Sequence, residues 1–357
     1  MLRNRLIVAS FMAVLFAGAL HADKVTYMAK GEFKNAEGVT ITDWSAAKVT
    51  FKTSDDKSTS VDYKDILSLD RHYGSMGAEL ANALDLVGSD PGGAIDALAA
   101  VAENGSKLDR EEATIIRAQL LDNESANNAS AAPEAMKAYS DYIKNWKAGY
   151  FAREAYRGLA ALQINNKQTD AARTTLRNMA RADNAMQREG NQALGEFEAG
   201  EGKWSDAITA FKAAQSAAKT EKDSNAEALA KAWEGWMTLK AGNASEAKAL
   251  LESVTTDDSL DDPDSTTDEI ALSVAFPALG DTHFAGGNYQ KGYDAYIKGA
   301  YYAWWARGNQ EGRCLGRAYV CAKKLEGTDA KWKSRKEKLR TALALGFPRI
   351  LQDSDKE

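Results

Sequence analysis

A spacing pattern of glycine and aromatic residues, which occurs twice, is the feature that most constrains this chain. The first copy consists of Gly195, Gly202, Trp204, Ala207 and Phe211, and the second, at the same offsets, of Gly280, Gly287, Tyr289, Gly292 and Tyr296. Each copy predicts two helices joined by a tight turn, with small residues where the helices touch and aromatic side chains in the gap. Such a pair cannot bury its apolar face alone and must stack on neighbouring pairs. The pattern therefore predicts a helical-repeat protein.

Segments with a helical pattern of apolar residues continue on both sides of these two copies. The expected helices are Met76–Val87, Ala94–Ala102, Arg110–Leu121, Pro133–Trp146, Tyr150–Ile164, Thr169–Ala182, Asn184–Ala199, Ser205–Lys219, Asn225–Lys240, Ser245–Val254, Asp268–Phe284, Tyr289–Trp305, Gln310–Lys324 and Asp329–Leu345. The small residue at the close-packed point of each second helix is expected at Ala94, Ala135, Ala171, Ala207, Ala247 and Gly292, at intervals of 41, 36, 36, 40 and 45 residues. Short turns between the helices favour antiparallel hairpins throughout.

These residues resemble the tetratricopeptide repeat (TPR) family, whose unit of ~34 residues carries W-x2-L-G-x2-Y, A-x3-F and a closing proline. Phe276, Leu279 and Gly280 match the first part of that motif, and Leu194 with Gly195 matches it nearly as well; a weaker third set is Gly235, Gly242, Ala247 and Leu251. The closing proline is absent from both good copies, and most intervals exceed the family period. The resemblance implies a mainly α fold, a TPR-like α-solenoid of antiparallel helix pairs over residues 74–345, followed by a C-terminal tail at 346–357.

The resemblance also implies a protein or peptide partner, held in a groove that the first helix of each pair lines. By this argument Arg153, Arg157, Gln192 and Lys240 are candidate partner-binding residues. A second candidate surface is the aromatic run Tyr301, Tyr302, Trp304 and Trp305. Consecutive helical residues point ~100° apart, so these four side chains cannot all pack in one direction. Either most of them pack the helix pair, or some form a contact surface.

Residues 23–73 follow a different pattern, with short runs rich in β-branched and aromatic residues. Strands are expected at Lys24–Ala29, Gly38–Trp44, Ala47–Thr53, Ser58–Asp62 and Ile66–Leu69. Alternating apolar and polar residues in the second and third runs are typical of half-buried strands. Residues 34–38 and 54–57 predict turns, and 63–66 a single helical turn before the last strand.

The strand order and the ending Val61-x-Tyr63-x-x-Ile66 resemble the small SH3-like β-barrel, here preceding the solenoid. If Trp44 is exposed, it is a candidate ligand platform, as aromatic residues are in SH3 grooves. The favoured interpretation is that Trp44 packs against the helical part or the end of the barrel.

The N-terminus predicts an export signal over residues 1–22. Arg3 and Arg5 precede an apolar run of 15 residues from Leu6 to Leu20, and small residues follow. This is the pattern of a cleaved signal peptide, and the run is shorter than the ~20 residues that span a bilayer. Cleavage is expected after Ala19 or Ala22. The mature chain is then expected to lack a transmembrane segment and to lie in the periplasm or outside the cell.

Composition narrows the possible partners and chemistry. The formal charge of −6, from 45 basic and 51 acidic residues, argues against nucleic acid as a partner, because such proteins neutralise phosphates with surplus Lys and Arg. Cys314 and Cys321 lie two helical turns apart, roughly 10.5 Å along the axis, which is too far for a disulfide. We expect both to be free, buried thiols.

Motifs for catalysis, cofactor binding or metal binding do not stand out, and we expect no catalytic residues, no cofactor and no metal. His283 is expected to be a packed core residue. The acidic segment at 257–269 lacks the spacing of an EF-hand, so a solvated loop is favoured over a Ca²⁺ site. The resulting hypothesis is a non-enzymatic protein-interaction scaffold of the cell envelope. The alternative is an envelope enzyme, or an accessory protein that binds a cell-wall polymer through the barrel.

Overall fold

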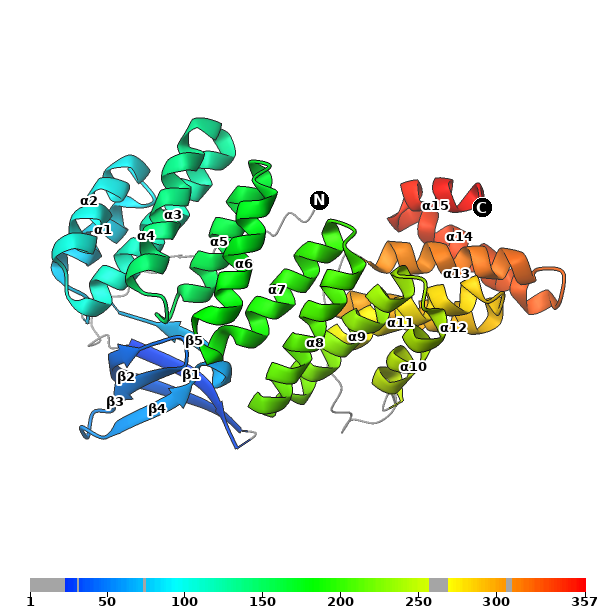
Figure 1. Ribbon diagram of the computed structural model, residues 1–357, viewed down its shortest axis with the longest axis horizontal. Helices are drawn as coiled ribbons and strands as arrows, with labels where there is room; N and C mark the ends of the chain where they lie inside the picture. Colours follow the sequence, from blue (N-terminus) through cyan, green and yellow to red (C-terminus); the bar gives the residue numbers. More distant parts are fainter. Residues whose placement is uncertain (1–22, 31, 73–74, 257–268, 306–309) are drawn as a thin grey trace. The chain divides into compact units, whose positions relative to one another are not determined.

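The computed structural model describes residues 23–30, 32–72, 75–256, 269–305 and 310–357. The chain divides into two compact units, one ending at Phe151 and one running from Ala152 to Glu357. The first unit contains the sheet and helices α1 to α4, and the second contains helices α5 to α15 (Figure 1). The expected export signal at 1–22, the boundary between residues 73 and 74, and the acidic segment at 257–268 lie outside the described residues and stay predictions.

The first unit begins with a five-stranded antiparallel sheet. Its strands are β1 (Asp23–Ala29), β2 (Glu32–Trp44), β3 (Lys48–Lys52), β4 (Ser58–Asp62) and β5 (Ile66–Asp70). They lie in the order β4-β3-β2-β1-β5, and one 3-10 turn, η1 (Tyr63–Asp65), precedes β5. Five strands with a single helical turn before the last one were expected from the sequence.

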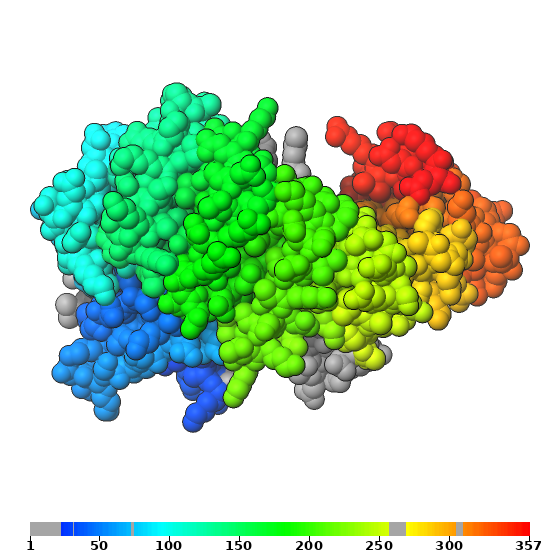
Figure 2. Space-filling view, in the orientation of Figure 1, coloured from blue at the N-terminus to red at the C-terminus, as the bar shows by residue number. Residues whose placement is uncertain are grey.

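Strand β2 corrects one sequence expectation. Residues 34–38 do not form a turn but continue the strand, which pairs with β1 over that stretch. Gly38 has a φ of +72° and is an unpaired bulge residue, because Asp23 pairs with Val39 while Lys24 pairs with Glu37. Glycine is favoured both in bulges and in turns because it adopts positive φ values at little energetic cost. The turn lies earlier, and the β1–β2 hairpin projects from the surface of the first unit (Figure 2).

Trp44 joins the sheet to the helices of the first unit. It is 3% exposed, its indole Nε1 donates a hydrogen bond of 2.8 Å to Glu111 Oε2, and its ring stacks on Tyr150 with centroids 5.6 Å apart. Glu111 Oε1 also accepts hydrogen bonds from the Tyr142 hydroxyl at 2.6 Å and from the Tyr150 backbone N–H at 2.7 Å. The expectation that Trp44 packs rather than serving as an exposed platform is confirmed.

The helices of the first unit are α1 (Ala78–Leu86), α2 (Pro91–Asn104), α3 (Lys107–Asn127) and α4 (Ala132–Asn145), with a short 3-10 turn, η2 (Ala129–Ala131), before α4. Arg71, just after β5, ties the sheet to α3. Its side chain is 4% exposed and bonds Asp109 at 2.6 Å and Glu112 at 2.8 Å. Burial raises the pKa of Glu112 to about 7, although the charge of Arg71 opposes the shift.

The described residues of the second unit form helices joined by turns. Its helices are α5 (Ala152–Asn165), α6 (Thr169–Ala182), α7 (Gln187–Gly200), α8 (Trp204–Glu221), α9 (Ser224–Lys240), α10 (Ala244–Thr255), α11 (Glu269–Ala285), α12 (Tyr289–Trp305), α13 (Glu311–Leu325), α14 (Ala330–Gly346) and α15 (Pro348–Asp355), with a 3-10 turn, η3 (Asn184–Met186), before α7. Each of the fourteen expected helices is present. Helix α15 was not expected and occupies the segment assigned to a tail, where its Asp355 accepts a hydrogen bond from Tyr319 of α13.

The glycines of the repeated glycine and aromatic pattern lie at close helix contacts and at tight turns, as their spacing predicts. A Cβ added at Gly195 would lie 2.6 Å from the Phe211 ring, one at Gly235 2.8 Å from Leu251, and one at Gly280 2.7 Å from the Tyr296 ring. In all three pairs the large side chain follows the glycine by sixteen residues. The turn glycines Gly202, Gly242 and Gly287 have φ values of +73°, +94° and +73°. Three helix pairs therefore share one close-packed geometry.

The α5–α6 pair repeats this turn without a glycine. Lys167 takes the left-handed conformation, with φ +60°, and its N–H bonds the Ile164 carbonyl while Gln168 N–H bonds that of Gln163. The residue five positions beyond the turn is Ala172, fully buried like Ala207 and Ala247. The expected register position Ala171 is half-buried, and the expectation was therefore off by one residue.

Candidate functional site

Helices α6 and α7 belong to successive pairs and approach each other closely at one point. A Cβ added at Gly190 of α7 would lie 2.4 Å from the backbone nitrogen of Ala180 in α6. Real side chains do not tolerate that distance, so the absence of a side chain at Gly190 lets the two backbones meet. This contact holds in place the residues that lie next to it on both helices.

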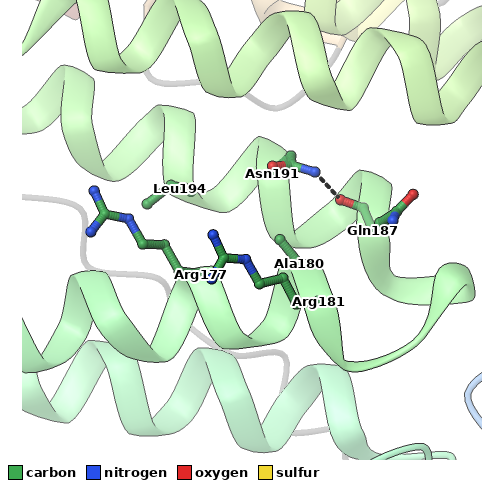
Figure 3. Close-up of a pocket in the computed structure, with 6 residues that line it drawn as sticks. All are labelled: Arg177, Ala180, Arg181, Gln187, Asn191 and Leu194. Carbon is green, nitrogen blue, oxygen red and sulfur yellow. Dashed lines mark hydrogen bonds between the residues drawn. The ribbon is translucent and has the colours of Figure 1, made fainter.

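A pocket of about 280 Å³ lies beside this contact, lined by Arg177, Ala180, Arg181, Gln187, Asn191 and Leu194. The two arginines come from α6 and both extend along that helix below α7, from which Gln187, Asn191 and Leu194 come (Figure 3). Asn191 is held by a hydrogen bond of 2.8 Å from its Nδ2 to the Gln187 carbonyl. The lining offers two guanidinium groups, two carboxamides and a small aliphatic surface.

Neighbouring arginines in the second unit each bind a carboxylate at short distance. Arg153 lies 3.0 Å from Glu189, Arg173 lies 2.7 Å from Glu198, and Arg188 lies 2.8 Å from Glu221. The hydrogen bond that Arg173 donates to Glu198 raises the pKa of Arg173. These arginines tie successive helices together.

The two pocket arginines differ from these neighbours. The nearest carboxylate to Arg177 is Glu198, at 3.9 Å, which Arg173 already binds. Arg181 forms no ion pair or hydrogen bond with any part of the chain that the structure describes. The Arg177 side chain is 49% exposed, and Arg181 is also exposed. The pocket therefore presents two cationic groups to solvent without a close counter-charge.

The predicted partner-binding residues on the first helices lie in different environments. Arg153 is 5% exposed and also donates to the Ala185 carbonyl at 2.7 Å, so it stabilises the unit and a partner cannot reach it. Arg157 is 56% exposed, with Glu189 3.9 Å away. Gln192 donates to Glu196 at 2.9 Å on the surface of α7, and Lys240 is exposed at the end of α9.

The aromatic run at the end of α12 divides between core and surface. Tyr302 is 6% exposed and stacks on Phe276 with ring centroids 5.6 Å apart, so we remove it from the contact residues. Tyr301 is 49% exposed and Trp304 is 60% exposed, and Ile270 at the start of α11 is 48% exposed. The side chain of Trp305 lies outside the described part of the structure. Tyr301 and Trp304 remain candidate contact residues.

The remaining sequence candidates have structural explanations. Cys314 and Cys321 are free and buried, as expected, and burial raises the pKa of each thiol to about 12. His283 is only half-buried. The expectation that it is a core residue was therefore only partly correct. Partial burial and the nearby Lys248 lower its pKa. Among the described residues, no three His, Cys, Asp or Glu side chains group as a metal site.

Arg177 and Arg181 were not among the candidate residues predicted from the sequence. Their spacing of four residues on an expected helix, which places both side chains on one face, was visible in the sequence. What singles them out is the lack of a close carboxylate, and their neighbours' partners lie 25 to 36 residues away in the chain. Sequence spacing alone does not show which arginines are paired.

Solved structures that resemble the chain include a TPR-repeat protein. The quorum sensor NprR from Bacillus thuringiensis has a TM-score of 0.50 and 12% identity, over 78% of this chain and 79% of that one. The pilF protein of Pseudomonas aeruginosa has a TM-score of 0.46 and 14% identity, over 69% and 98%. The C-terminal part of a TPR-repeat protein from Cytophaga hutchinsonii has a TM-score of 0.43 and 16% identity, over 67% and 84%.

The second unit has a TPR-like α-solenoid fold, and a five-stranded antiparallel sheet precedes the helical array. At 12% identity, the likeness to NprR bears on the fold alone. No family model and no curated protein matches the sequence. Across the described ranges, no helix is both long and apolar enough to cross a bilayer.

Proposed function

We propose that this protein is an exported, non-enzymatic scaffold that binds a segment of another protein on its helical-repeat surface in the cell envelope. The observation that carries the proposal is the pocket between α6 and α7, where two exposed guanidinium groups lack close carboxylates within the described chain. Every other arginine of α6 and α7 is within 3.0 Å of a carboxylate. The pocket therefore differs from the ion-paired surface around it.

The size of the pocket favours a polypeptide over a small molecule. Small-molecule sites commonly enclose ~300–1,000 Å³, and the cavity of about 280 Å³ is at or below the small end of that range. It accommodates one or two side chains of a larger partner. Such a partner extends to neighbouring helices, where Arg157, Gln192 and Lys240 are exposed or half-buried. Tyr301 and Trp304 form a further candidate surface on α12.

Export to the envelope is supported by the sequence of residues 1–22, with its basic start, apolar run and small residues. Fractionation of cells that express the full chain tests it. We expect a processed protein in the periplasmic or extracellular fraction, beginning after Ala19 or Ala22. A full-length protein in the cytoplasm would contradict the proposal.

The absence of enzymatic activity is part of the proposal. The pocket lining has no carboxylate, histidine, thiol or hydroxyl group, and those are the groups that catalyse hydrolysis as acids, bases or nucleophiles. Trp44, the candidate ligand platform of the barrel, is buried. Hydrolysis of cell-wall material by the purified chain would contradict the proposal that the protein is not an enzyme.

Partner capture tests the site sterically. Residues 23–357 serve as bait in an envelope extract with chemical cross-linking, alongside Asn191→Trp, which fills the pocket, and Ser334→Trp, which places the same bulk on an exposed face of α14. We expect a stoichiometric partner with the wild-type chain and Ser334→Trp, and loss of that partner with Asn191→Trp. Equal capture by all three baits would refute the site.

A further inference from the structure

We infer that the pocket between α6 and α7 recognises carboxylate groups, and that its partner is an acidic peptide segment with an aliphatic side chain beside the acid. The inference rests on the proposed function and adds the chemistry of the partner. Arginine binds carboxylates through two parallel hydrogen bonds, a geometry that few other side chains match. Arg177 and Arg181 both line the cavity, so two carboxylates or one shared carboxylate fit between them.

Helix stability does not explain the arginine pair. Like charges four residues apart destabilise a helix slightly, and no carboxylate compensates at Arg181 within the described chain. Arg181 lies in the last turn of α6, where a cation interacts favourably with the helix dipole. Arg177 lies one turn earlier, beyond the range of that effect. An anionic ligand gives both residues a common role.

The geometry of α7 adds to the positive field. Gln187 is the first residue of α7, and the N-terminal end of a helix carries a partial positive charge. The contact between Gly190 and Ala180 holds this end of α7 against the C-terminal half of α6. The Gln187 side chain makes no hydrogen bond with the described residues, so its amide can donate to a bound carbonyl or carboxylate.

The apolar part of the lining selects the neighbouring side chain. Leu194 is half-buried, and Ala180 lies below it on α6. Together with the aliphatic stems of the arginines, they offer a surface for one leucine-sized group. A nucleic acid fits poorly, because two cations neutralise few phosphates and the whole chain carries a formal charge of −6.

The test uses labelled synthetic peptides and the chain of residues 23–357. Three peptides are compared: one blocked at both ends with a Leu-Glu-Glu-Leu core, its Leu-Gln-Gln-Leu counterpart, and that counterpart with a free C-terminal carboxylate. The first and third separate side-chain carboxylates from a terminal carboxylate. Fluorescence anisotropy measures binding up to about 1 mM, the range of weak peptide affinities.

The acidic peptide is expected to bind more tightly than its glutamine counterpart, and more weakly at high salt because part of the attraction is screened. Arg177→Gln and Arg181→Gln should each weaken binding by up to roughly fivefold, the upper end of the range for exposed ion pairs. The matched control is Arg340→Gln, at an exposed position of α14, which should leave binding unchanged. A thermal melt of each variant verifies the fold.

Equal binding of the acidic and glutamine peptides, or binding that neither arginine substitution changes, would overturn the inference. Preferential binding of a single-stranded oligonucleotide at the same two arginines would also overturn it. The proposed function fails separately: if Asn191→Trp abolishes partner capture while acidic peptides show no preference, the site stands and its carboxylate chemistry is wrong. If Asn191→Trp has no effect on capture, the site itself is wrong.

Discussion

Replacing Gly195 by alanine should destabilise the protein, although alanine is the better helix former. The added Cβ would lie 2.6 Å from the Phe211 ring. Phe211 is fully buried and cannot retreat, because its other face stacks on Trp233, with centroids 5.6 Å apart and planes at 14°, and Trp233 in turn stacks on Trp236. The strain must therefore move either a helix or a column of three aromatic rings.

The magnitude follows from two opposing effects. Overpacking a filled core costs about 1–3 kcal/mol, and replacing glycine by alanine inside a helix returns about 0.5–1 kcal/mol. The net expectation for Gly195→Ala is a loss of roughly 1 kcal/mol, and at most about 2.5 kcal/mol, in the free energy of unfolding. The same substitution at Gly200, in the same helix but with no atom within 4 Å of the new Cβ, should gain up to about 1 kcal/mol.

Urea denaturation followed by tryptophan fluorescence compares the two variants, because Trp233 and Trp236 belong to the affected column. We expect a lower midpoint for Gly195→Ala and an equal or higher midpoint for Gly200→Ala, with unchanged slopes. If Gly195→Ala is as stable as the wild-type chain, the glycine does not mark a close helix contact. The interpretation of the repeated spacing would then fail for all three pairs.

Three further substitutions test buried polar groups and backbone strain. Glu111→Gln should lower the free energy of unfolding in a thermal melt by about 1–3 kcal/mol, because either orientation of the amide leaves the indole N–H of Trp44 or the backbone N–H of Tyr150 facing another donor. The pKa of Glu112 is raised to about 7 from 4.5, so the folded state holds this proton more tightly than the unfolded state. Stability should therefore fall by up to about 3 kcal/mol as the pH rises between those values, and Glu112→Gln should remove that fall from the pH series of urea midpoints. Lys167→Gly should raise the melting temperature, because a non-glycine residue in the left-handed region costs about 1–2 kcal/mol and Lys167 has a φ of +60°; an unchanged or lower value would show that the turn is not strained.

Most of the helical array could be predicted from the sequence because its determinants are local. Apolar periodicity marks each helix, and a glycine with positive φ marks three of the turns, at Gly202, Gly242 and Gly287. Helix α15 lacks such marks because it is only eight residues long, and it is held by contacts with α13, where a Cβ at Gly316 would meet Ile350 at 2.6 Å. Helix α15 is thus stabilised by contacts with a segment distant in the sequence, and a local sequence pattern does not reveal such contacts.

The same distinction explains the error in β2. Glycine and asparagine at 34–38 are typical of turns, yet a bulge makes the same demand on the backbone at Gly38. Residues 34–38 form a bulged strand rather than a turn because they pair with β1. Which strands pair depends on the whole sheet and not on the local sequence. The sequence likewise showed where Arg153, Arg173, Arg177 and Arg181 lie along the helices, but their partners depend on how successive helices pack.

Spacing within three of the helix pairs is constant, and spacing between pairs is not. In these three pairs the glycine and its large partner are sixteen residues apart. Successive turns, at Lys167, Gly202, Gly242 and Gly287, are separated by 35, 40 and 45 residues. The candidate pocket lies between pairs, where α6 of one meets α7 of the next. The repeat motif constrains each pair internally and leaves the surfaces between pairs free to vary. A partner specific to this protein is therefore best sought at such a boundary, at Arg177 and Arg181, rather than at the positions that the motif itself defines.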